Sequence, residues 1–386
     1  MNIHLLAQEA NRSGGAAVHT AELCRQLARR GESVTLICHA ADAELDKLVQ
    51  VQRLPRSTFG GWPWLWRFAL PLRLAADLLA PPRLDLPPPD VLIVSDLPFW
   101  RMIRRKFPRT PMIYLPHALV APLEVAGYPF RSEMQRRMAV RTFAWLERRA
   151  LNQAAVTVRF TQTACDAMRD YYGPGIQPRF QLFAPPVPIP QERPAERAPG
   201  PLRLLSIGRL VESKNLSLLI RLLAPLTHLN WELNIVGDGE IRLRLEDEAR
   251  TSGLDRRIRF HGHRDDVDGF YRQADLFLLP SKLENAPLVL LEAMSHGVPA
   301  LSIRADGREY RNANHEIVEH GRTGFLTVNE ADFGKLLAGL LAQPEQLPAI
   351  GAAARTVMIQ RHGWETYVDQ LLERIRLEIT KPAAKP

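Results

Sequence analysis

The sequence has little cysteine and lacks the patterns that cysteine-based sites need. Its 386 residues contain three cysteines, Cys24, Cys38 and Cys165, an odd number without close spacing. This argues against a disulfide framework and a zinc site, and it is typical of a reducing compartment. The N-terminus lacks the basic start, apolar run and small-residue cleavage site of a signal peptide, and no uncharged run could span a bilayer. We therefore expect a cytoplasmic protein.

Internal repeats at a solenoid period are also lacking, so the chain must be organised into ordinary domains. Its length exceeds what one hydrophobic core usually serves and suits two α/β domains. With 46% hydrophobic and 24% charged residues, the composition is that of a globular protein.

Positive charge is concentrated in one segment. The formal net charge is +8, and residues 97–160 alone hold twelve Arg and Lys against three Glu, an excess of nine. Just upstream, "FGGWPWLWRFALPLRLAADLLAPP" (59–82) combines Trp62, Trp64 and Trp66 with basic residues. Aromatic residues beside basic ones suit the interface of an anionic membrane, but a core-facing helix with a solvated basic face explains them equally well. No nucleic-acid motif is present, so we expect no nucleic-acid partner.

The N-terminal part alternates strand and helix patterns. We predict strands at 3–7, 33–39, 90–95 and 111–116, and a helix at 18–30 that follows the loop Ser13-Gly14-Gly15. Strands separated by helices predict a parallel sheet with helices on both faces.

The segment "FAPPVPIPQERPAERAPGP" (183–201) is too rich in proline for a helix and predicts a stiff spacer. The alternation then resumes, with strands expected at 202–207, 232–236, 257–260, 275–279 and 298–303 and helices near 215–224, 239–252, 266–273 and 288–296. We predict an N-terminal domain (1–183), a linker (184–201) and a C-terminal domain (202–362), followed by a last helix within 363–380 that needs an apolar surface, such as that of the first domain. The fold class is α/β, with two doubly wound Rossmann-like domains that face each other across a ligand-binding cleft.

The stretch "SKLENAPLVLLEAMSHGVPALS" (281–302) carries two glutamates around an apolar run. Pro287 is favoured in the first turn of a helix, so we place the helix from about Pro287 to Gly297. Glu284 then lies on the loop after a strand, and Glu292 faces inward about two turns into the helix. The free N–H groups at the helix start, with Leu288 and its neighbours, predict an anion site between two hydroxyl-binding carboxylates.

Matching cations follow another strand. In "LRLLSIGRLVESKNLSLLI" (202–220), Gly208 ends the strand, and Arg209 and Lys214 follow it. Arg can bind a phosphate with two parallel hydrogen bonds and Lys adds a compact charge, so the pair predicts phosphate binding.

These motifs resemble glycosyltransferase family 4. The resemblance is carried by "GRLVESKN", "NIVGDGEIRLRLEDEA", "IRFHGHRDDVDGFYRQADLFLLPS" and the Glu-seven-Glu spacing of "ENAPLVLLE", in this order from about residue 202 to residue 326. It is looser over the N-terminal part, where "SGGAAVHTAELCRQLARRGESVTLI" is similar to the family's first glycine loop and helix. The resemblance implies a retaining enzyme of GT-B fold that uses a nucleotide-diphosphate sugar.

The resemblance also implies roles for individual residues. Gly14 and Gly15 would bring backbone N–H groups to the diphosphate, and Arg209, Lys214 and the N–H of Leu288 would neutralise it. Glu292 would bind the ribose, Glu284 the donor sugar, and His117 would contact the same sugar. The turn His261-Gly262-His263 would pass beside the nucleotide base, mainly through its backbone.

Other motifs are assigned simpler roles. The aspartates of "DDVDG" (265–269) are expected to cap a helix and not to bind a metal, and no cofactor is expected besides the donor substrate. Gly237-Asp238-Gly239 is too short to indicate a dinucleotide site. Where the family often has a glycine this chain has Pro287, which has no N–H, and the segment 303–325 before Glu316 is longer than usual.

The resemblance implies a hexosyltransferase that acts in lipopolysaccharide, glycolipid or polysaccharide synthesis. A lipid-linked or saccharide acceptor and peripheral association with the cytoplasmic face of the inner membrane suit its basic, aromatic N-terminal part. Two alternatives stay open. One is a GT-B sugar-nucleotide epimerase, and the other is a catalytically silent sugar-nucleotide-binding protein.

Overall fold

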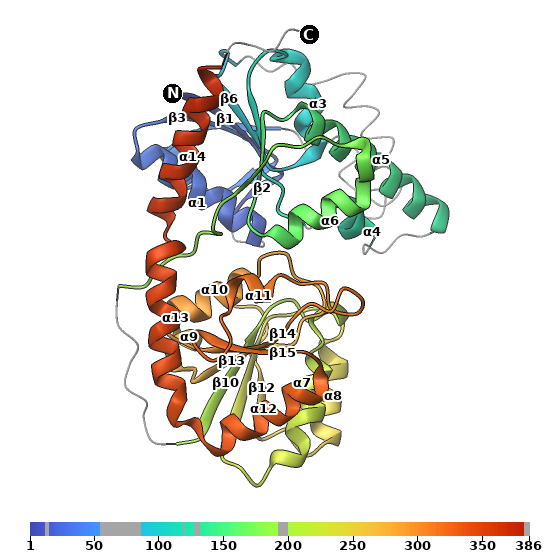
Figure 1. The fold of residues 1–386 in the computed structure, drawn as a ribbon, viewed down its shortest axis with the longest axis vertical. Coiled ribbons are helices and arrows are strands. Elements are labelled where there is room, and N and C mark those ends of the chain that lie inside the picture. The colour runs from blue at the N-terminus through green and yellow to red at the C-terminus, as the bar shows by residue number, and fades with distance from the viewer. Residues whose placement is uncertain (12–14, 55–85, 119, 127–131, 192–199, 382–386) are drawn as a thin grey trace. The chain divides into compact units, whose positions relative to one another are not determined.

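The computed structural model describes residues 1–11, 15–54, 86–118, 120–126, 132–191 and 200–381. The chain forms two compact units. Unit 1 comprises Met1–Phe183 and Tyr367–Pro386, and unit 2 comprises Ala184–Thr366. In each unit a parallel sheet is covered by helices on both faces (Figure 1). The tryptophan-rich segment 59–82 lies outside the described residues.

Unit 1 is built on a seven-stranded parallel sheet of order β5-β3-β1-β6-β7-β8-β9. Because the chain moves outward from β1 in one direction and then from β6 in the other, the topology is doubly wound. The strands are β1 (Asn2–Leu6), β3 (Ser33–Cys38), β5 (Gln50–Arg53), β6 (Val91–Val94), β7 (Met112–Tyr114), β8 (Val156–Arg159) and β9 (Phe180–Leu182), beside a small pair β2 (Glu9–Ala10) and β4 (Ala40–Ala41).

The helices of unit 1 include one long element, α5. They are α1 (Gly15–Arg29), α3 (Leu97–Lys106), α4 (Ala121–Ala126), α5 (Glu133–Gln153), α6 (Gln162–Tyr172) and α14 (Trp364–Ile379, from Tyr367 on), with the short helices η1 (Leu45–Lys47) and η2 (Gly173–Gly175). On α14, the ring of Tyr367 contacts the rings of His19, Phe160 and Phe183 of the same unit. Over the described residues, no helix is both long and apolar enough to cross a bilayer.

Unit 2 contains a six-stranded parallel sheet of order β12-β11-β10-β13-β14-β15, which is the Rossmann order 3-2-1-4-5-6. Its strands are β10 (Leu202–Ile207), β11 (Trp231–Val236), β12 (Ile258–Phe260), β13 (Leu276–Leu279), β14 (Ala300–Ile303) and β15 (Gly324–Thr327). Its helices are α7 (Leu216–Leu223), α8 (Arg242–Thr251), α9 (Asp268–Gln273), α10 (Leu288–Ser295), α11 (Asn314–Ile317), α12 (Glu330–Ala342) and α13 (Leu347–Arg361), with η3 (Glu212–Lys214), η4 (Ala224–Leu226) and η5 (Pro344–Gln346).

Side chains of the unit 2 strands alternate between two cores, as the two-residue period of a strand requires. Leu204 and Leu233 pack in one cluster with α7, α8 and α12. Leu205 and Phe277 pack in the other cluster with α9, α10 and α13. The helices that follow β10 and β13 therefore lie on opposite faces of the sheet.

The segment predicted as a spacer is partly packed. Val187 is buried in the second of these cores and its N–H donates to the carbonyl of His362 at 2.8 Å. His362 in turn contacts the carbonyl of Pro185 through Nδ1 at 2.9 Å, and Arg355 donates to the carbonyl of Pro190. Residues 184–191 thus follow α13 inside unit 2, whereas 192–199 lie outside the described residues.

Helix α10 is held against α13 by a close contact that only glycine permits. A Cβ added to Gly351 of α13 would overlap the carbonyl oxygen of Gly297, which follows α10. No larger residue fits there without moving one helix, so this contact fixes the distance between α13 and the end of α10.

We predict that Gly351→Ala lowers the free energy of unfolding by about 1–3 kcal/mol, because the added methyl group forces α10 and α13 apart. Gly339→Ala in α12 is the matched control, since its added Cβ has no atom within 4 Å. There the better helix propensity of alanine should raise stability by up to about 1 kcal/mol. Urea unfolding of both variants checks this, and equal effects would contradict the packing argument.

Candidate functional site

The predicted donor-binding residues of unit 2 follow β10 and β13, the two central strands of its sheet. These strands are hydrogen-bonded neighbours, and the chain leaves them toward opposite faces. Open α/β sheets bind ligands at such a switch point, beyond the carboxyl ends of the strands, because the two diverging loops leave a crevice there. The sequence therefore places its cations and carboxylates at the expected position of this sheet.

Lys214 and Glu284 are in direct contact. Lys214 ends η3 after β10, Glu284 lies on the loop after β13, and Lys214 Nζ is 2.5 Å from Glu284 Oε1. The two loops are also joined by their backbones, since the N–H of Lys282 donates to the carbonyl of Ser213 at 2.8 Å. An ammonium group has three N–H donors, so Lys214 can hold Glu284 and still offer donors to an anion.

Arg209 lies on the same loop, immediately after Gly208, and its side chain is exposed. The backbone of Gly208 is approached closely by Gly237, whose φ is +136° and whose added Cβ would overlap the Gly208 carbonyl. The turn that contains Gly237 therefore supports the loop that carries Arg209, and its glycine is explained by this contact without any dinucleotide site.

Helix α10 begins at Leu288, as in the expected range 288–296 and one residue after the start placed at about Pro287. Leu288 is its first residue and Pro287 is the N-cap, so the proline precedes the first turn instead of occupying it. Pro287 is outside the helix because its backbone is extended, with ψ at 104°. The missing N–H of Pro287 is outside the helix. The N–H groups of Leu290 and Leu291 donate to the carbonyl of Pro287 at 3.0 and 3.3 Å, so those of Leu288 and Val289 are the donors without a partner within the helix.

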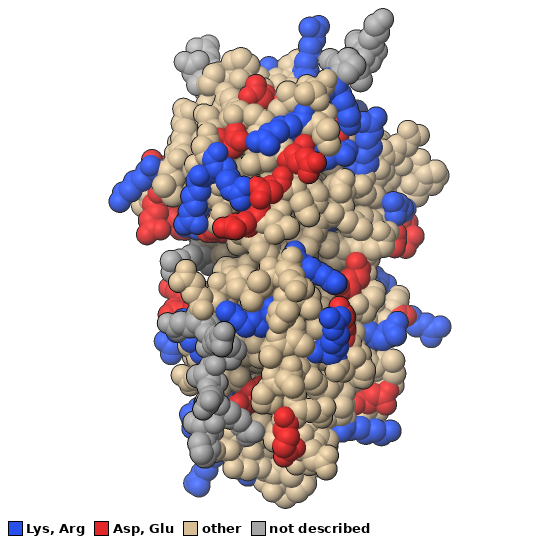
Figure 2. All heavy atoms as spheres, turned by 60° about the vertical axis from the view of Figure 1, so that its left-hand side comes forward, with Lys and Arg blue, Asp and Glu red and all other residues tan. Residues whose placement is uncertain are grey.

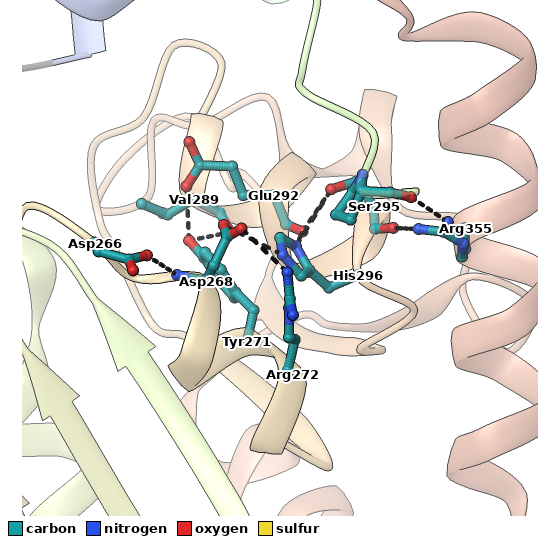
Figure 3. A network of polar contacts seen from close by, with 10 residues as sticks. Asp266, Asp268, Tyr271, Arg272, Val289, Glu292, Ser295, His296 and Arg355 are labelled. Atoms are coloured by element: carbon teal, nitrogen blue, oxygen red, sulfur yellow. Dashed lines mark hydrogen bonds and ion pairs between the residues drawn. The ribbon is translucent and has the colours of Figure 1, made fainter. Parts of the chain in front are cut away.

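Glu292 lies four residues after Leu288, a little over one turn into α10 and not two. Tyr271 of α9 donates its hydroxyl to Glu292 Oε2 at 2.8 Å and also lies 3.3 Å from the carbonyl of Val289 (Figure 3). Within the described part of the chain, Glu292 Oε1 accepts no hydrogen bond. One oxygen is thus fixed by Tyr271 and the other can accept from a ligand hydroxyl.

The end of α10 is fixed by a polar network. His296 Nδ1 donates to the backbone carbonyl of Glu292 at 2.8 Å, and His296 Nε2 lies 3.5 Å from Asp268 Oδ1. The His296 ring stacks on the ring of Tyr271. Ser295 donates to the same carbonyl, and Arg355 of α13 donates to the carbonyl of Ser295 (Figure 3). Burial, and then the charge of Asp268, raise the pKa of Glu292 above its ordinary value, although the Tyr271 hydrogen bond acts in the other direction.

The turn His261-Gly262-His263 follows β12. His261 Nε2 lies 2.8 Å from Asn234 Oδ1, and its ring packs on Phe270 and lines a cavity of about 130 Å³. Gly262 adopts φ +69° and its carbonyl accepts from the N–H of Gly237. His263 is exposed, 3.4 Å from Asp265. Because the side chain of His261 is already engaged, a base could meet this turn mainly through its backbone.

The aspartates before α9 only partly act as predicted. Asp266 Oδ1 accepts the N–H of Asp268, but the N-cap is Val267, which has no capping side chain. Asp268 lies in the first turn, where a carboxylate is favoured by the helix dipole. No group of three or more His, Cys, Asp or Glu with the geometry of a metal site occurs among the residues that the structure describes.

In unit 1, the predicted residues lie after β1 and β7. Gly14 lies outside the described residues, and Gly15 is the exposed first residue of α1. His117 follows β7, and its ring packs edge-on against that of His19 of α1, 4.9 Å between centroids. Burial, and then the charge of Arg159, lower the pKa of His117 to about 4. The imidazole is therefore neutral near pH 7 and can act as a hydrogen-bonding group but not as a cation.

Buried hydrogen bonds beside His117 involve two residues, Arg159 and Glu147, that no sequence motif indicates. Arg159, at the end of β8, donates to the carbonyls of Pro116 and Ala118 at 3.2 and 2.9 Å and thus holds both neighbours of His117. Glu147 of α5, which has no exposed surface, accepts from the N–H of Ala121 and from two tyrosines, Tyr114 and Tyr172. Its signal in the sequence was an acidic residue at a core-facing position of a basic helix.

We predict that Glu147→Ala costs about 3 kcal/mol or more of unfolding free energy, because it leaves three donors buried without an acceptor. Glu133→Ala on the same helix is the control, because Glu133 is 52% exposed and pairs with exposed arginines. Its loss should cost much less than the loss of Glu147, because solvent screens an exposed ion pair. Denaturant unfolding of both variants measures this, and similar costs would contradict the network's role.

A pH prediction follows from Glu292. The raised pKa means that Glu292 binds its proton more tightly in the folded state than in the unfolded state. The protonated carboxyl therefore contributes to the free energy of unfolding below pH 4.5, and this contribution is lost as pH rises through the folded-state pKa. Glutamine imitates the protonated form, so the stability of Glu292→Gln relative to the parent should increase from about pH 4 to about pH 8.

Glu133→Gln is again the control for this titration. The pKa of Glu133 is lowered to about 2, mainly by the hydrogen bond from Arg136, so the stability of its variant relative to the parent should fall as pH rises from about 2 to about 4.5 and stay level above that. Urea unfolding across the pH range decides the matter. A pH-independent difference for Glu292→Gln would show that Glu292 has the same pKa in both states.

Comparisons with known families agree with the fold. The chain matches the family "Glycosyl transferases group 1" over residues 189–357 and "Glycosyltransferase Family 4" over residues 13–187. Among curated proteins, it is 32% identical over 168 residues to the lipopolysaccharide core biosynthesis glycosyltransferase LpsE of Rhizobium meliloti, covering 43% of this chain and 45% of that one. It is 29% identical over 191 residues to the amylovoran biosynthesis glycosyltransferase AmsK of Erwinia amylovora, covering 45% of each chain. The aligned part is thus less than half the length of these relatives.

Solved structures share the fold over nearly the whole chain. Sucrose-phosphate synthase from Thermosynechococcus elongatus has a TM-score of 0.78 at 19% identity, covering 97% of this chain and 98% of that one. The glycosyltransferase WaaG, involved in lipopolysaccharide biosynthesis, has a TM-score of 0.68 at 20% identity, covering 97% and 99%. The two family matches, two doubly wound units and these structural neighbours agree. The chain belongs to the group 1 glycosyltransferases of family 4, and its fold is GT-B.

Proposed function

We propose that the protein is a retaining glycosyltransferase that moves a sugar from a nucleotide-diphosphate sugar to a hydroxyl group of an acceptor. The observation that carries this proposal is the contact between Lys214 and Glu284 at the switch point of unit 2. It brings an anion-binding cation and a hydroxyl-binding carboxylate to one place, beside the free N–H groups of α10. A ligand with a diphosphate next to a sugar has the matching chemistry.

In the proposed reaction, the bond between the anomeric carbon and the diphosphate oxygen breaks, and a bond to the acceptor oxygen forms on the same face of the sugar. The acceptor's proton passes to an oxygen of the departing diphosphate, so charge and atoms balance. Arg209, Lys214 and the N–H of Leu288 stabilise the leaving group. Glu284 orients the sugar through its hydroxyls, and Glu292 Oε1 accepts from the ribose.

The groups of unit 1 would act by hydrogen bonding. His117 is neutral near pH 7 and would contact the donor sugar as a donor or acceptor. Gly14 and Gly15 would offer backbone N–H groups to the diphosphate. The fixed positive charges and the helix start would supply the charge stabilisation, so the proposed mechanism requires no metal ion.

The names of the relatives support an acceptor in surface-glycan synthesis. LpsE is named for lipopolysaccharide core biosynthesis and AmsK for amylovoran biosynthesis. One structural neighbour, Anabaena HepE, was solved in complex with UDP and glucose, which makes UDP-sugars the first donors to test. We propose a lipid-linked or saccharide acceptor and a cytoplasmic enzyme that works peripherally at the inner membrane surface.

Two other functions would use the same donor pocket. A GT-B epimerase would invert a sugar carbon or release free nucleotide diphosphate without any acceptor. A silent binding protein would bind the nucleotide sugar and transfer nothing. Arg209, Lys214, Glu284, Glu292 and His117 together favour transfer, because mere binding does not need all five.

We predict that one nucleotide sugar in a panel of UDP-, GDP- and ADP-sugars stabilises the full chain against heating, by about 2.7 kcal/mol at a hundred times its Kd. Arg209→Ala should raise this Kd at least about tenfold, because a charge-assisted hydrogen bond to phosphate is lost. Arg256→Ala is the matched control, since Arg256 is an exposed arginine of the same unit away from the switch point.

Nucleotide release is then measured with glycan and lipid-linked acceptors. Release that depends on an acceptor supports transfer, whereas equal release or sugar inversion without acceptor supports the epimerase. Failure of every nucleotide sugar to stabilise the protein contradicts the proposal as a whole. An unchanged transfer rate in Glu284→Ala contradicts the role of that residue alone.

A further inference from the structure

Helix α5 has an exposed face with an unusual composition. Along its 21 residues, seven of the exposed side chains recur every three or four positions and share one side of the helix. This face, called the α5 stripe below, consists of Met134, Arg137, Met138, Arg141, Trp145, Arg148 and Arg149. We propose that the α5 stripe docks unit 1 on an anionic lipid surface.

The core of unit 1 already accounts for the opposite face of α5. Ala139, Leu146, Ala150 and Leu151 are buried, as is Glu147 in its hydrogen-bonded network. These positions lie about half a turn away from the α5 stripe. The helix is therefore anchored from behind, and the stripe is left facing outward as a rigid surface.

The apolar members of the α5 stripe are unusually exposed. Met134 is 69% exposed, Met138 47% and Trp145 39%. Met134 and Trp145 are eleven positions apart, which is about 16 Å along the helix axis. Three large apolar side chains in one row on a helix surface indicate a surface that another apolar phase covers. Trp suits the boundary between lipid headgroups and acyl chains because its ring is apolar and its N–H is polar. Met suits the same boundary because its flexible, unbranched side chain adapts to irregular surroundings.

The charged members of the α5 stripe all have the same sign. Arg137, Arg141, Arg148 and Arg149 are exposed. Arg137 pairs with Glu133 in the first turn of the helix and Arg148 donates to the carbonyl of Gly175, so the stripe with this neighbour still carries an excess of three positive charges. The guanidinium of Arg149 lies over the ring of Trp145 at 4.5 Å, so a cation and an aromatic side chain are presented together. Arginine binds phosphate oxygens with paired hydrogen bonds, and its stem can lie along an apolar surface while its head meets the phosphate.

Another face of unit 1 shows that this arrangement is not general. On the face that includes α14, acidic and basic side chains are intermixed (Figure 2). There Arg30 pairs with Asp369, and Arg376 lies 3.9 Å from Glu32. Such a surface has no net attraction for an anionic layer, whereas the α5 stripe has.

Charge also decides between possible occupants. A symmetric contact between two copies through the α5 stripe would place arginines against arginines, which is unfavourable. A nucleic acid would match the arginines but would leave the two methionines without an apolar partner. An anionic bilayer matches both sets at once, with phosphates for the arginines and acyl chains for Met134, Met138 and Trp145.

This inference rests on the proposed function, because a lipid-linked acceptor would be met at such a surface. The two can fail separately. Vesicle binding is measured without any nucleotide sugar, and donor binding by thermal shift is measured without vesicles.

The test uses flotation of the full chain with vesicles of phosphatidylglycerol and phosphatidylcholine in equal amounts, and with vesicles of phosphatidylcholine alone. We expect binding to the anionic vesicles only, weakened by added salt. Arg137→Gln with Arg141→Gln, and separately Met134→Ser with Met138→Ser, should each reduce the affinity about tenfold or more.

Matched control pairs are available in unit 2. Arg250→Gln with Arg256→Gln removes the same charge, and Leu243→Ser with Ile359→Ser removes exposed apolar side chains, 80% and 52% exposed. Both controls should bind vesicles like the parent. Unchanged thermal stability and unchanged donor-induced stabilisation of the α5 variants show that they are folded.

Three outcomes would overturn the proposal. The α5 variants could float with anionic vesicles as well as the parent does, which would place any membrane contact elsewhere in the chain. They could lose binding to a single-stranded RNA probe and keep vesicle binding, which would make the stripe a nucleic-acid surface. They could change the oligomeric state in sedimentation and keep vesicle binding, which would make it a contact between copies.

Discussion

The contact between Lys214 and Glu284 is the interaction on which the candidate site depends. It joins the loops that follow β10 and β13, and these loops lead to helices on opposite faces of the sheet. Glu284 is only 9% exposed, so its charge requires a partner, and Lys214 supplies one. The two loops are thereby held together where a parallel sheet of this order leaves a crevice. Arg209 and the start of α10 owe their positions to the same pair of loops.

The two buried carboxylates Glu147 and Glu292 have similar surroundings but differ in how many of their oxygens are hydrogen-bonded. Glu147 and Glu292 each accept a hydrogen bond from a tyrosine hydroxyl, and burial raises the pKa of both. Both oxygens of Glu147 have partners, from Tyr114, Tyr172 and the backbone of Ala121. Among the residues that the structure describes, Glu292 has a side-chain partner on one oxygen only. A carboxylate whose acceptors are all in use holds a fold together, whereas one with an unused acceptor retains the capacity to bind a ligand.

Elements with strong local signals could be predicted from the sequence. The apolar run of β10 and the glycine after it were located to the residue, and Pro287 located the start of α10 to within one position. Strands such as β8 and β9 were not predicted, because runs of three or four residues carry too little periodicity. The same holds for the site. Motif spacing found Glu284 and Glu292, but the contacts of Glu284 with Lys214 and of Glu292 with Tyr271 join separate segments of the chain and cannot be read from spacing.

The amount of charge follows from the sequence, but its placement on the surface does not. The excess of nine positive charges in residues 97–160 suggested one basic surface. Several of these arginines are engaged by other groups of the protein. Arg159 is buried against two carbonyls, Arg104 donates to the carbonyl of Thr110, and the exposed Arg136 and Arg137 both pair with Glu133. Helix geometry then aligns Arg137, Arg141, Arg148 and Arg149 on one side of α5, because the spacing of three and four residues repeats with the helical turn. A surface with a defined direction arises from this alignment, and a count of charges along the sequence cannot reveal it.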